Sequence, residues 1–229
     1  MRRVVPVLIF TAIAIASCSS RPVVFSAPWF DADEVRKSNP AVLLPEDIDI
    51  QAMVPDFITA YDGDPGRGVR EARSVLLDCL TGERISQLSS RGVRLDFVDA
   101  TSTLHEASLR ALIGFESDKY GIRSLVVKDP GALAALLLEG GIEYLVCFPE
   151  LVFAHQVLPT RGTGRGGISA RGGKHVYLSG EAIVWSMERQ DIAWHGIVSG
   201  HRRIHGGASK GTIEGAIEAF AGDLYNALN

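Results

Sequence analysis

The strongest constraint on the fold lies between residue 175 and the end of the sequence. Residues 175–188 and 191–204 are predicted to form two strands joined by a turn near Arg189 and Gln190. The segment that follows, "TIEGAIEAFAGDLYNALN", repeats apolar residues at three- and four-residue spacing, which is typical of an amphipathic helix. A long hairpin and such a helix must each bury an apolar face, so they predict a layer of sheet packed against helices.

The turn also predicts a register for this hairpin. If the loop is symmetric about Arg189 and Gln190, Trp185 faces Trp194 and Met187 faces Ile192. A cross-strand pair of indoles would contribute up to about 1 kcal/mol to the register. The alternative is that the two tryptophans cover the core separately.

The upstream sequence alternates further strand and helix patterns. "AVLLPEDIDI" is predicted to begin as a strand that Pro45 limits, and "IEYLVCFPEL" is apolar on both faces, as central strands are. Helices are expected over residues 68–90, from about Ser102, and after Asp129-Pro130, with a strand over 93–100. The predicted fold is therefore α/β, with α+β possible: a single domain over residues 40–229 with a mixed sheet, a late hairpin and a C-terminal helix.

The first residues have the order of an export signal. Two arginines precede an apolar run from Val4 to about Ala14, and small residues follow. The run is shorter than the roughly 20 apolar residues that span a bilayer. We therefore expect a signal peptide over residues 1–17 and a tether over 18–39.

The end of this signal, Ile15-Ala16-Ser17-Cys18, resembles the lipobox of bacterial lipoproteins. The resemblance implies that Cys18 carries lipid and becomes the mature N-terminus. Ser19, rather than an aspartate, implies an outer-membrane anchor that faces the periplasm. The alternatives are an ordinary secreted protein with a cysteine at the cleavage site, and a membrane-spanning anchor.

Charge and cysteine usage limit the possible partners. The full chain has 23 basic and 27 acidic residues, and removal of residues 1–17 leaves 21 and 27, a net charge of −6. Such a balance argues against a nucleic-acid-binding protein. Cys79 and Cys147 lie in apolar runs and are expected to be buried thiols, although a disulfide is chemically possible in an oxidising compartment.

A glycine-rich stretch, "TRGTGRGGISARGGKH", contains a literal GxGxxG. A dinucleotide site needs a helix directly after this motif, but a strand pattern follows it here. A P-loop fails as well, because Ile168 and His175 occupy positions that require glycine and a hydroxyl residue. No cofactor is therefore expected. The stretch remains a basic loop without acids, and its candidate anion or partner contacts are Arg161, Arg165, Arg171 and Lys174; a solvated loop without function is the alternative.

Signs of catalysis or metal binding are weak. His195, His201 and His205 would share one strand face at separations of about 20 and 13 Å, too wide for one ion. No metal site is therefore expected. Four aspartates cluster at the ends of expected loops: Asp47, Asp49, Asp62 and Asp64. Pairs of carboxylates can catalyse glycoside hydrolysis, so these aspartates are the candidates for such an activity.

The layout resembles small periplasmic lipoproteins that share the fold of the TolB N-terminal domain, including CsgG-type and LpoB-type lipoproteins. The resemblance rests on the lipobox, "AVLLPEDIDI", "IEYLVCF" and the hairpin "EAIVWSMERQDIAWHG" before a C-terminal helix. It implies a lipid-anchored, non-catalytic adaptor or assembly factor with an envelope protein partner. The alternative is an envelope hydrolase acting on cell-wall or lipid substrates.

Overall fold

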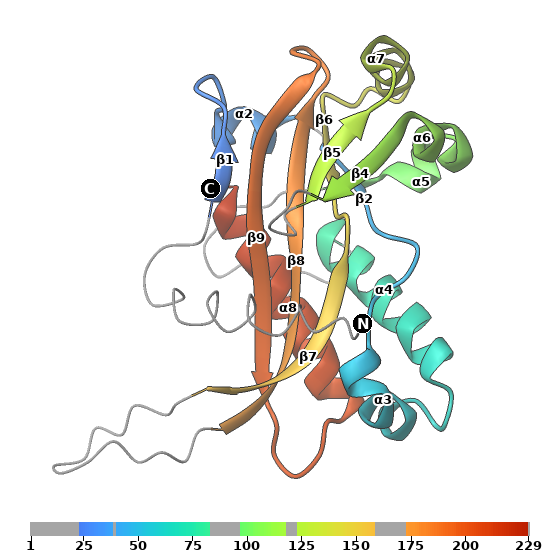
Figure 1. Ribbon diagram of the computed structural model, residues 1–229, viewed down its shortest axis with the longest axis vertical. Helices are drawn as coiled ribbons and strands as arrows, with labels where there is room; N and C mark the ends of the chain where they lie inside the picture. The colour runs from blue at the N-terminus through green and yellow to red at the C-terminus, as the bar shows by residue number, and fades with distance from the viewer. Residues whose placement is uncertain (1–22, 39, 83–96, 118–122, 159–172, 229) are drawn as a thin grey trace, which may run out of the picture.

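The computed structural model describes residues 23–38, 40–82, 97–117, 123–158 and 173–228 (Figure 1). Its helices are α2 (Ala32–Lys37), α3 (Val54–Ala60), α4 (Pro65–Leu80), α5 (Ala100–Thr103), α6 (Glu106–Leu112), α7 (Pro130–Glu139) and α8 (Lys210–Ala227), and a 3-10 turn, η1 (Gln51–Met53), precedes α3. Its strands are β1 (Val23–Ser26), β2 (Ala41–Leu43), β3 (Val98–Asp99), β4 (Ile113–Ser117), β5 (Arg123–Val127), β6 (Tyr144–Cys147), β7 (Leu151–Leu158), β8 (Gly173–Ser186) and β9 (Asp191–Arg203). In this part of the chain, every helix is too short or too polar to cross a membrane.

One mixed sheet organises the molecule. Its strand order is β1-β9-β8-β6-β2-β3, and β7 pairs with β8 beyond the end of β6. Strand β2 runs parallel to β3 and β6, whereas the other pairs are antiparallel. Strands β4 and β5 form a separate antiparallel hairpin. The prediction of a single α/β domain with a mixed sheet, a late hairpin and a C-terminal helix is confirmed.

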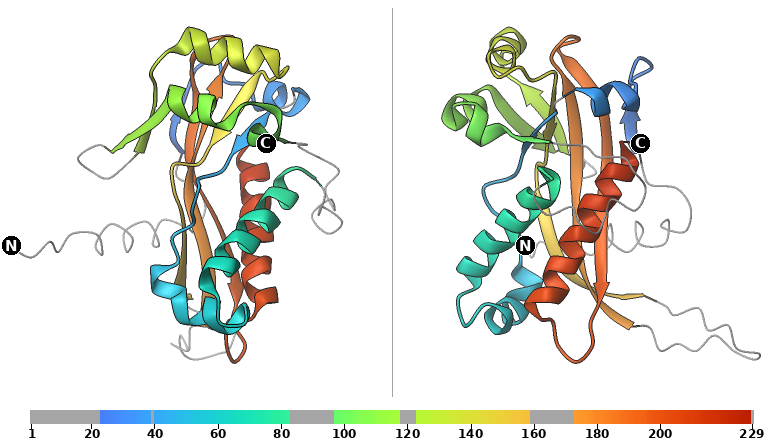
Figure 2. Two further views of the ribbon diagram at one scale, coloured as in Figure 1. Left: turned by 90° about the vertical axis from the view of Figure 1, so that its right-hand side faces the viewer. Right: turned by 180° about the vertical axis from the view of Figure 1, so that it is seen from behind.

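The sheet separates two apolar cores. Helices α4 and α8 cover one face, as the view from behind in Figure 2 shows, and enclose what we call the α4/α8 core, which includes Phe57, Leu76, Phe153 and Phe220. Helices α5 to α7 and the β4-β5 hairpin cover part of the other face and enclose the α5–α7 core, which includes Leu109, Leu133, Leu145 and Trp185.

Helix starts follow from local capping chemistry. Asp129 accepts a hydrogen bond from the backbone N–H of Ala132, and Pro130 occupies the first turn of α7, as predicted. The same Asp-Pro pair starts α4, where Asp64 accepts from the N–H of Arg67. Helix α4 therefore begins at Pro65, three residues before the predicted start at Gly68, because its first turn is polar and lies outside the apolar repeat.

The expectation that residues 18–39 form a tether is wrong for residues 23–38, which we call the N-terminal strap. Strand β1 pairs with β9, and the side chain of Val35 on α2 is completely buried. Tyr144 donates a hydrogen bond to Glu34 over 3.4 Å, and burial together with Glu34 raises the pKa of Tyr144 to about 12. The guanidinium of Arg189 lies 5.7 Å from the Trp29 ring. These contacts make the strap part of the domain. The predicted signal peptide and Cys18 lie outside the described residues.

The predicted tryptophan pair is also wrong. A β-bulge between Val184 and Trp185 shifts the register, so that Trp194 pairs with Val184 while Trp185 pairs with Ile192. Trp185 therefore faces the α5–α7 core and Trp194 the α4/α8 core. The alternative, in which each indole covers its own part of the core, is the observed one.

The two described cysteines do not form a disulfide with each other. Cys79 belongs to the α4/α8 core and Cys147 to the α5–α7 core, so the sheet lies between them. Burial raises the pKa of the Cys147 thiol to about 12, which keeps it protonated and unreactive. The prediction of buried thiols is confirmed.

Candidate functional site

The glycine-rich stretch connects the ends of two paired strands. Leu158 on β7 pairs with Gly173 on β8, and Val157 pairs with Lys174, so residues 159–172 link β7 to β8. The described ends of these strands project from the body of the molecule (Figure 1). We call residues 155–158 and 173–176 the β7-β8 arm. Of the predicted contact residues, Lys174 lies on this arm and is exposed. Arg161, Arg165 and Arg171 lie outside the described residues.

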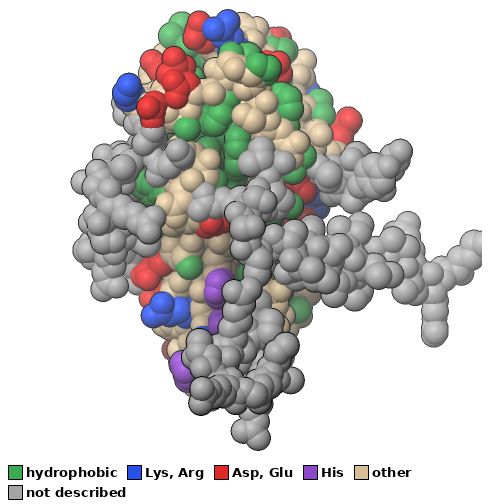
Figure 3. Space-filling view, turned by 90° about the vertical axis from the view of Figure 1, so that its left-hand side faces the viewer, with side chains coloured by type: hydrophobic (Ala, Val, Ile, Leu, Met, Phe, Trp, Pro, Cys, Tyr) green, Lys and Arg blue, Asp and Glu red, His purple; other side chains and the backbone are tan. Residues whose placement is uncertain are grey.

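The end of β9 adds cationic residues that the sequence analysis did not single out. Arg203 pairs with His175, and Arg202 pairs with Val176. We call this end of the β8-β9 pair the basic end, and it consists of Lys174, His175, His201, Arg202, Arg203 and His205, most of them exposed. On the face that Figure 3 shows, histidine side chains gather toward one end, and acidic side chains are more numerous toward the other end, where lysine or arginine side chains are also visible.

The basic end joins two stretches that contain no acidic residue. Residues 151–180 carry four arginines and lysines, and residues 192–213 carry three. Strands β8 and β9 pair the two stretches over six residues, 175–180 with 198–203. In a protein with more acidic than basic residues, this pairing places Lys174, Arg202 and Arg203 at the same end of β8 and β9, which predicts attraction to an anionic partner. A search for long stretches without acidic residues would have found both stretches in the sequence. Only the strand register shows that the two stretches lie side by side.

Two histidine side chains, His175 and His201, contact each other in the basic end. Of the three histidines that were considered as metal ligands from the sequence, only His201 takes part in this contact. The rings of His175 and His201 lie 5.3 Å apart, and Tyr177 stacks on His201 at 6.2 Å. The Nδ1–H of His175 donates to the carbonyl of Gly173, since a carbonyl can only accept. His195 instead contacts Glu181 at 3.2 Å. Among the described residues, no three histidine, cysteine or carboxylate side chains are grouped to hold a metal ion.

The pKa of His201 is lowered from its usual value by burial and by the neighbouring His175, against the opposite effect of Asp223. The neutral imidazole is therefore favoured in the folded protein. Because the pKa of His201 is lower in the folded state than its value of about 6.5 in the unfolded chain, its contribution to the free energy of unfolding is fully present above pH 6.5. This contribution is lost as the pH falls through the folded-state pKa.

We predict that His175→Gln raises the pKa of His201, because the substitution removes a positive charge that competes with its protonation. Titration of the imidazole resonances by NMR measures this change. His105→Asn is the matched control, since His105 caps α6 and asparagine preserves a capping acceptor. Equal His201 midpoints in the wild type and in His175→Gln would contradict the coupling.

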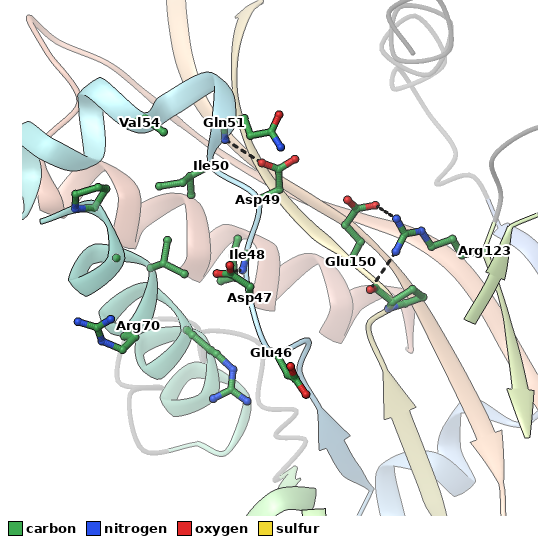
Figure 4. A pocket seen from close by; sticks show the side chains of 15 residues that line it. Glu46, Asp47, Ile48, Asp49, Ile50, Gln51, Val54, Arg70, Arg123 and Glu150 are labelled. Carbon is green, nitrogen blue, oxygen red and sulfur yellow. Dashed lines mark hydrogen bonds and ion pairs between the residues drawn. The ribbon is translucent and has the colours of Figure 1, made fainter. Parts of the chain in front are cut away.

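A groove lies at the carboxyl ends of the parallel strands β2 and β6. The chain after β2 and the residues after β6 form its walls together with the start of α4, and its volume is about 730 Å³ (Figure 4). Ligands of α/β proteins commonly bind outside the carboxyl ends of parallel strands. The charged residues that line this groove are Glu46, Asp47, Asp49, Arg70, Arg73, Arg123 and Glu150.

The groove walls are held by side chains from distant elements. Arg73 donates to the carbonyl of Pro45 at 3.0 Å, and Arg110 donates to the carbonyl of Leu44 at 3.2 Å. On the opposite wall of the groove, Arg123 forms an ion pair with Glu150 at 2.7 Å (Figure 4). Sequence reasoning missed these arginines because nothing local marks them, and the partners named here lie 28, 66 and 27 positions away in the sequence.

The four aspartates considered for hydrolysis separate into two pairs. Asp47 and Asp49 line the groove, and each accepts a backbone N–H, from Ile48 and Gln51 respectively. Asp64 caps α4, and Asp62 adopts a positive φ of 53° in the preceding turn. Of the four, only Asp47 and Asp49 line the groove.

We compared the chain with protein-family models, with curated proteins and with solved structures, and none of them matches it.

Proposed function

We propose that the chain is a lipid-anchored envelope lipoprotein that acts as a non-catalytic adaptor or assembly factor, and that its basic end binds an acidic surface of an envelope protein. The observation that carries the proposal is the grouping of Lys174, Arg202 and Arg203 at the basic end of an otherwise acidic protein. Such complementarity steers association and selects partners. The lipobox ending at Cys18 supports the envelope location, with the outer membrane facing the periplasm as the proposed site.

The β7-β8 arm supports a binding function independently of charge. Val157 near its end is 67% exposed, although its neighbours along β7 at positions 151 and 153 are fully buried. The arm therefore extends past the core that covers the rest of the strand. A projecting antiparallel pair presents both side chains and backbone to a partner without disturbing the fold.

Site-directed photocrosslinking in intact cells tests this proposal. A photoreactive residue at Val157 is expected to yield an adduct with one envelope protein, whereas the same residue at Leu138 on α7, which is also 67% exposed, is not. The combined change Arg202→Glu and Arg203→Glu should lower the adduct yield about tenfold, equivalent to about 1.4 kcal/mol of binding free energy. Equal adducts from positions 157 and 138, or a yield that the charge reversal leaves unchanged, would refute the proposed contact.

The groove favours a second candidate, an envelope hydrolase, because Asp47 and Asp49 both line a cavity large enough for a substrate. Release of soluble fragments from purified cell walls by the wild type, and loss of that release in Asp49→Asn, would favour the hydrolase over the adaptor.

A further inference from the structure

The distance between the proposed lipid anchor and the folded domain is short. The sequence alone suggested a tether over residues 18–39, but β1 begins at Val23. Five peptide steps separate Cys18 from Val23, and an extended chain spans at most about 3.6 Å per step. If Cys18 is acylated, as the proposed function holds, β1 starts within about 18 Å of the attachment point.

The strand nearest this anchor exposes apolar side chains. Val24 is 41% exposed and Phe25 is 45% exposed, and both lie on β1 at the edge of the sheet. The other exposed large hydrophobic residues of the described chain are Ile58, Leu138 and Val157, which lie on three separate elements. The partly buried Trp29 follows β1 with Arg189 beside its ring. Apolar residues with tryptophan and arginine nearby suit the boundary between lipid headgroups and acyl chains.

We propose that the outer edge of β1 rests on the surface of the membrane that holds the anchor, so that the domain is oriented there and is not a freely tethered body. The inference rests on the proposed lipid anchor at Cys18. The short link brings the edge to the membrane, and Val24 and Phe25 add apolar contact. In Figure 3, which views the molecule from the β1 side, hydrophobic side chains are visible among the acidic ones at the end away from the histidines.

Neighbouring groups limit the depth and the chemistry of this contact. The residues Asp31, Asp33 and Glu34 at the start of α2 are exposed and follow β1 closely. Their charge opposes attraction to anionic lipids, so the contact is apolar and insensitive to salt. The outer backbone groups of an edge strand also require hydrogen-bond partners, which headgroups and water supply but acyl chains do not. The edge therefore rests at headgroup depth.

This orientation has a consequence for the basic end. Gly196 on β9 pairs with β1, and Arg203 follows seven residues later. At about 3.3 Å per residue, the basic end lies roughly 23 Å from the β1 edge along the same strand. The membrane contact and the proposed partner contact therefore occupy separate parts of the molecule.

Fluorescence quenching on vesicles tests the inference. The full-length lipidated protein is reconstituted into vesicles of phosphatidylethanolamine and phosphatidylglycerol, with an environment-sensitive dye on Val24→Cys or on Ile58→Cys. The two positions are matched, since Val24 is 41% and Ile58 is 42% exposed, and the native Cys79 and Cys147 are buried from the dye. Lipids that carry a quencher at headgroup depth are expected to quench the dye at position 24 at least threefold more than at position 58, at both low and high salt.

Equal quenching at positions 24 and 58 of protein that floats with the vesicles would overturn the membrane contact and leave the anchor intact. Protein that carries no lipid and does not float with the vesicles would overturn both the anchor and the inference. Greater quenching at position 24 that disappears at high salt would overturn the apolar contact in favour of an electrostatic one.

Discussion

Gly200→Val is expected to destabilise the domain by about 3 kcal/mol or more, a large share of the 5–15 kcal/mol that stabilises a typical domain. A Cβ at Gly200 would lie 2.0 Å from the backbone nitrogen of Phe220 and 2.3 Å from the carbonyl oxygen of Ala216. Both atoms belong to the backbone of α8, which cannot move aside as a flexible side chain can. The substitution must therefore push α8 away from β9 and open the α4/α8 core. The urea midpoint, followed by circular dichroism, measures the loss.

Gly207→Val is the control for this effect. Gly207 lies between β9 and α8, and a Cβ there would have no atom within 4 Å. Its midpoint should stay within about 0.5 kcal/mol of the wild type, as is usual for surface substitutions. If Gly200→Val and Gly207→Val unfold at the same urea concentration, α8 does not lie against β9 as closely as the structure shows.

Cys18→Ser is expected to abolish labelling by radioactive palmitate and to release the protein from the membrane fraction. Each buried methylene contributes about 0.8 kcal/mol, so several acyl chains on one residue form a lasting anchor, and their loss leaves only a weak surface contact. Labelling in growing cells, followed by separation of membrane and soluble fractions, measures both effects.

The double variant Cys79→Ala and Cys147→Ala serves as the matched control, because both thiols are buried in the core and unsuited to acylation. It should keep the palmitate label. Persistent labelling of Cys18→Ser would show that lipid is attached elsewhere, and the proposed anchor would then have to be abandoned.

Much of the architecture could be predicted from local patterns. The start of α7 follows from Asp129-Pro130, since an aspartate cap and a proline in the first turn need no distant partner. Strand β6 lies in the interior of the sheet, as its continuous apolar run indicates, with all four residues buried. The predicted hairpin corresponds to β8 and β9, and the predicted C-terminal helix corresponds to α8. Each predicted end lies within two residues of the observed end.

The tether was predicted wrongly for residues 23–38 because their structure does not depend on local sequence. Residues 23–38 have no sustained periodicity, and β1 exists as a strand because β9 offers an edge with which it pairs. Likewise, the tryptophan register depended on a symmetric turn, and one β-bulge moved Trp185 and Trp194 to opposite faces of the sheet. Side chains along a strand alternate between the two faces of the sheet, so a single inserted residue moves every later side chain to the other face.

By itself, the sequence determined the elements that local chemistry specifies, namely capped helices, apolar strands and a basic glycine-rich stretch without acids, and it predicted a lipobox at Cys18. The tertiary structure decided which of these elements meet. It paired Lys174 and His175 of β8 with the end of β9, where Arg202 and Arg203 complete the basic end, and it placed β1 five peptide steps from Cys18. The physical reason is that helix caps and apolar repeats act over a few residues, whereas strand pairing joins residues that are far apart in the chain and so depends on the whole fold.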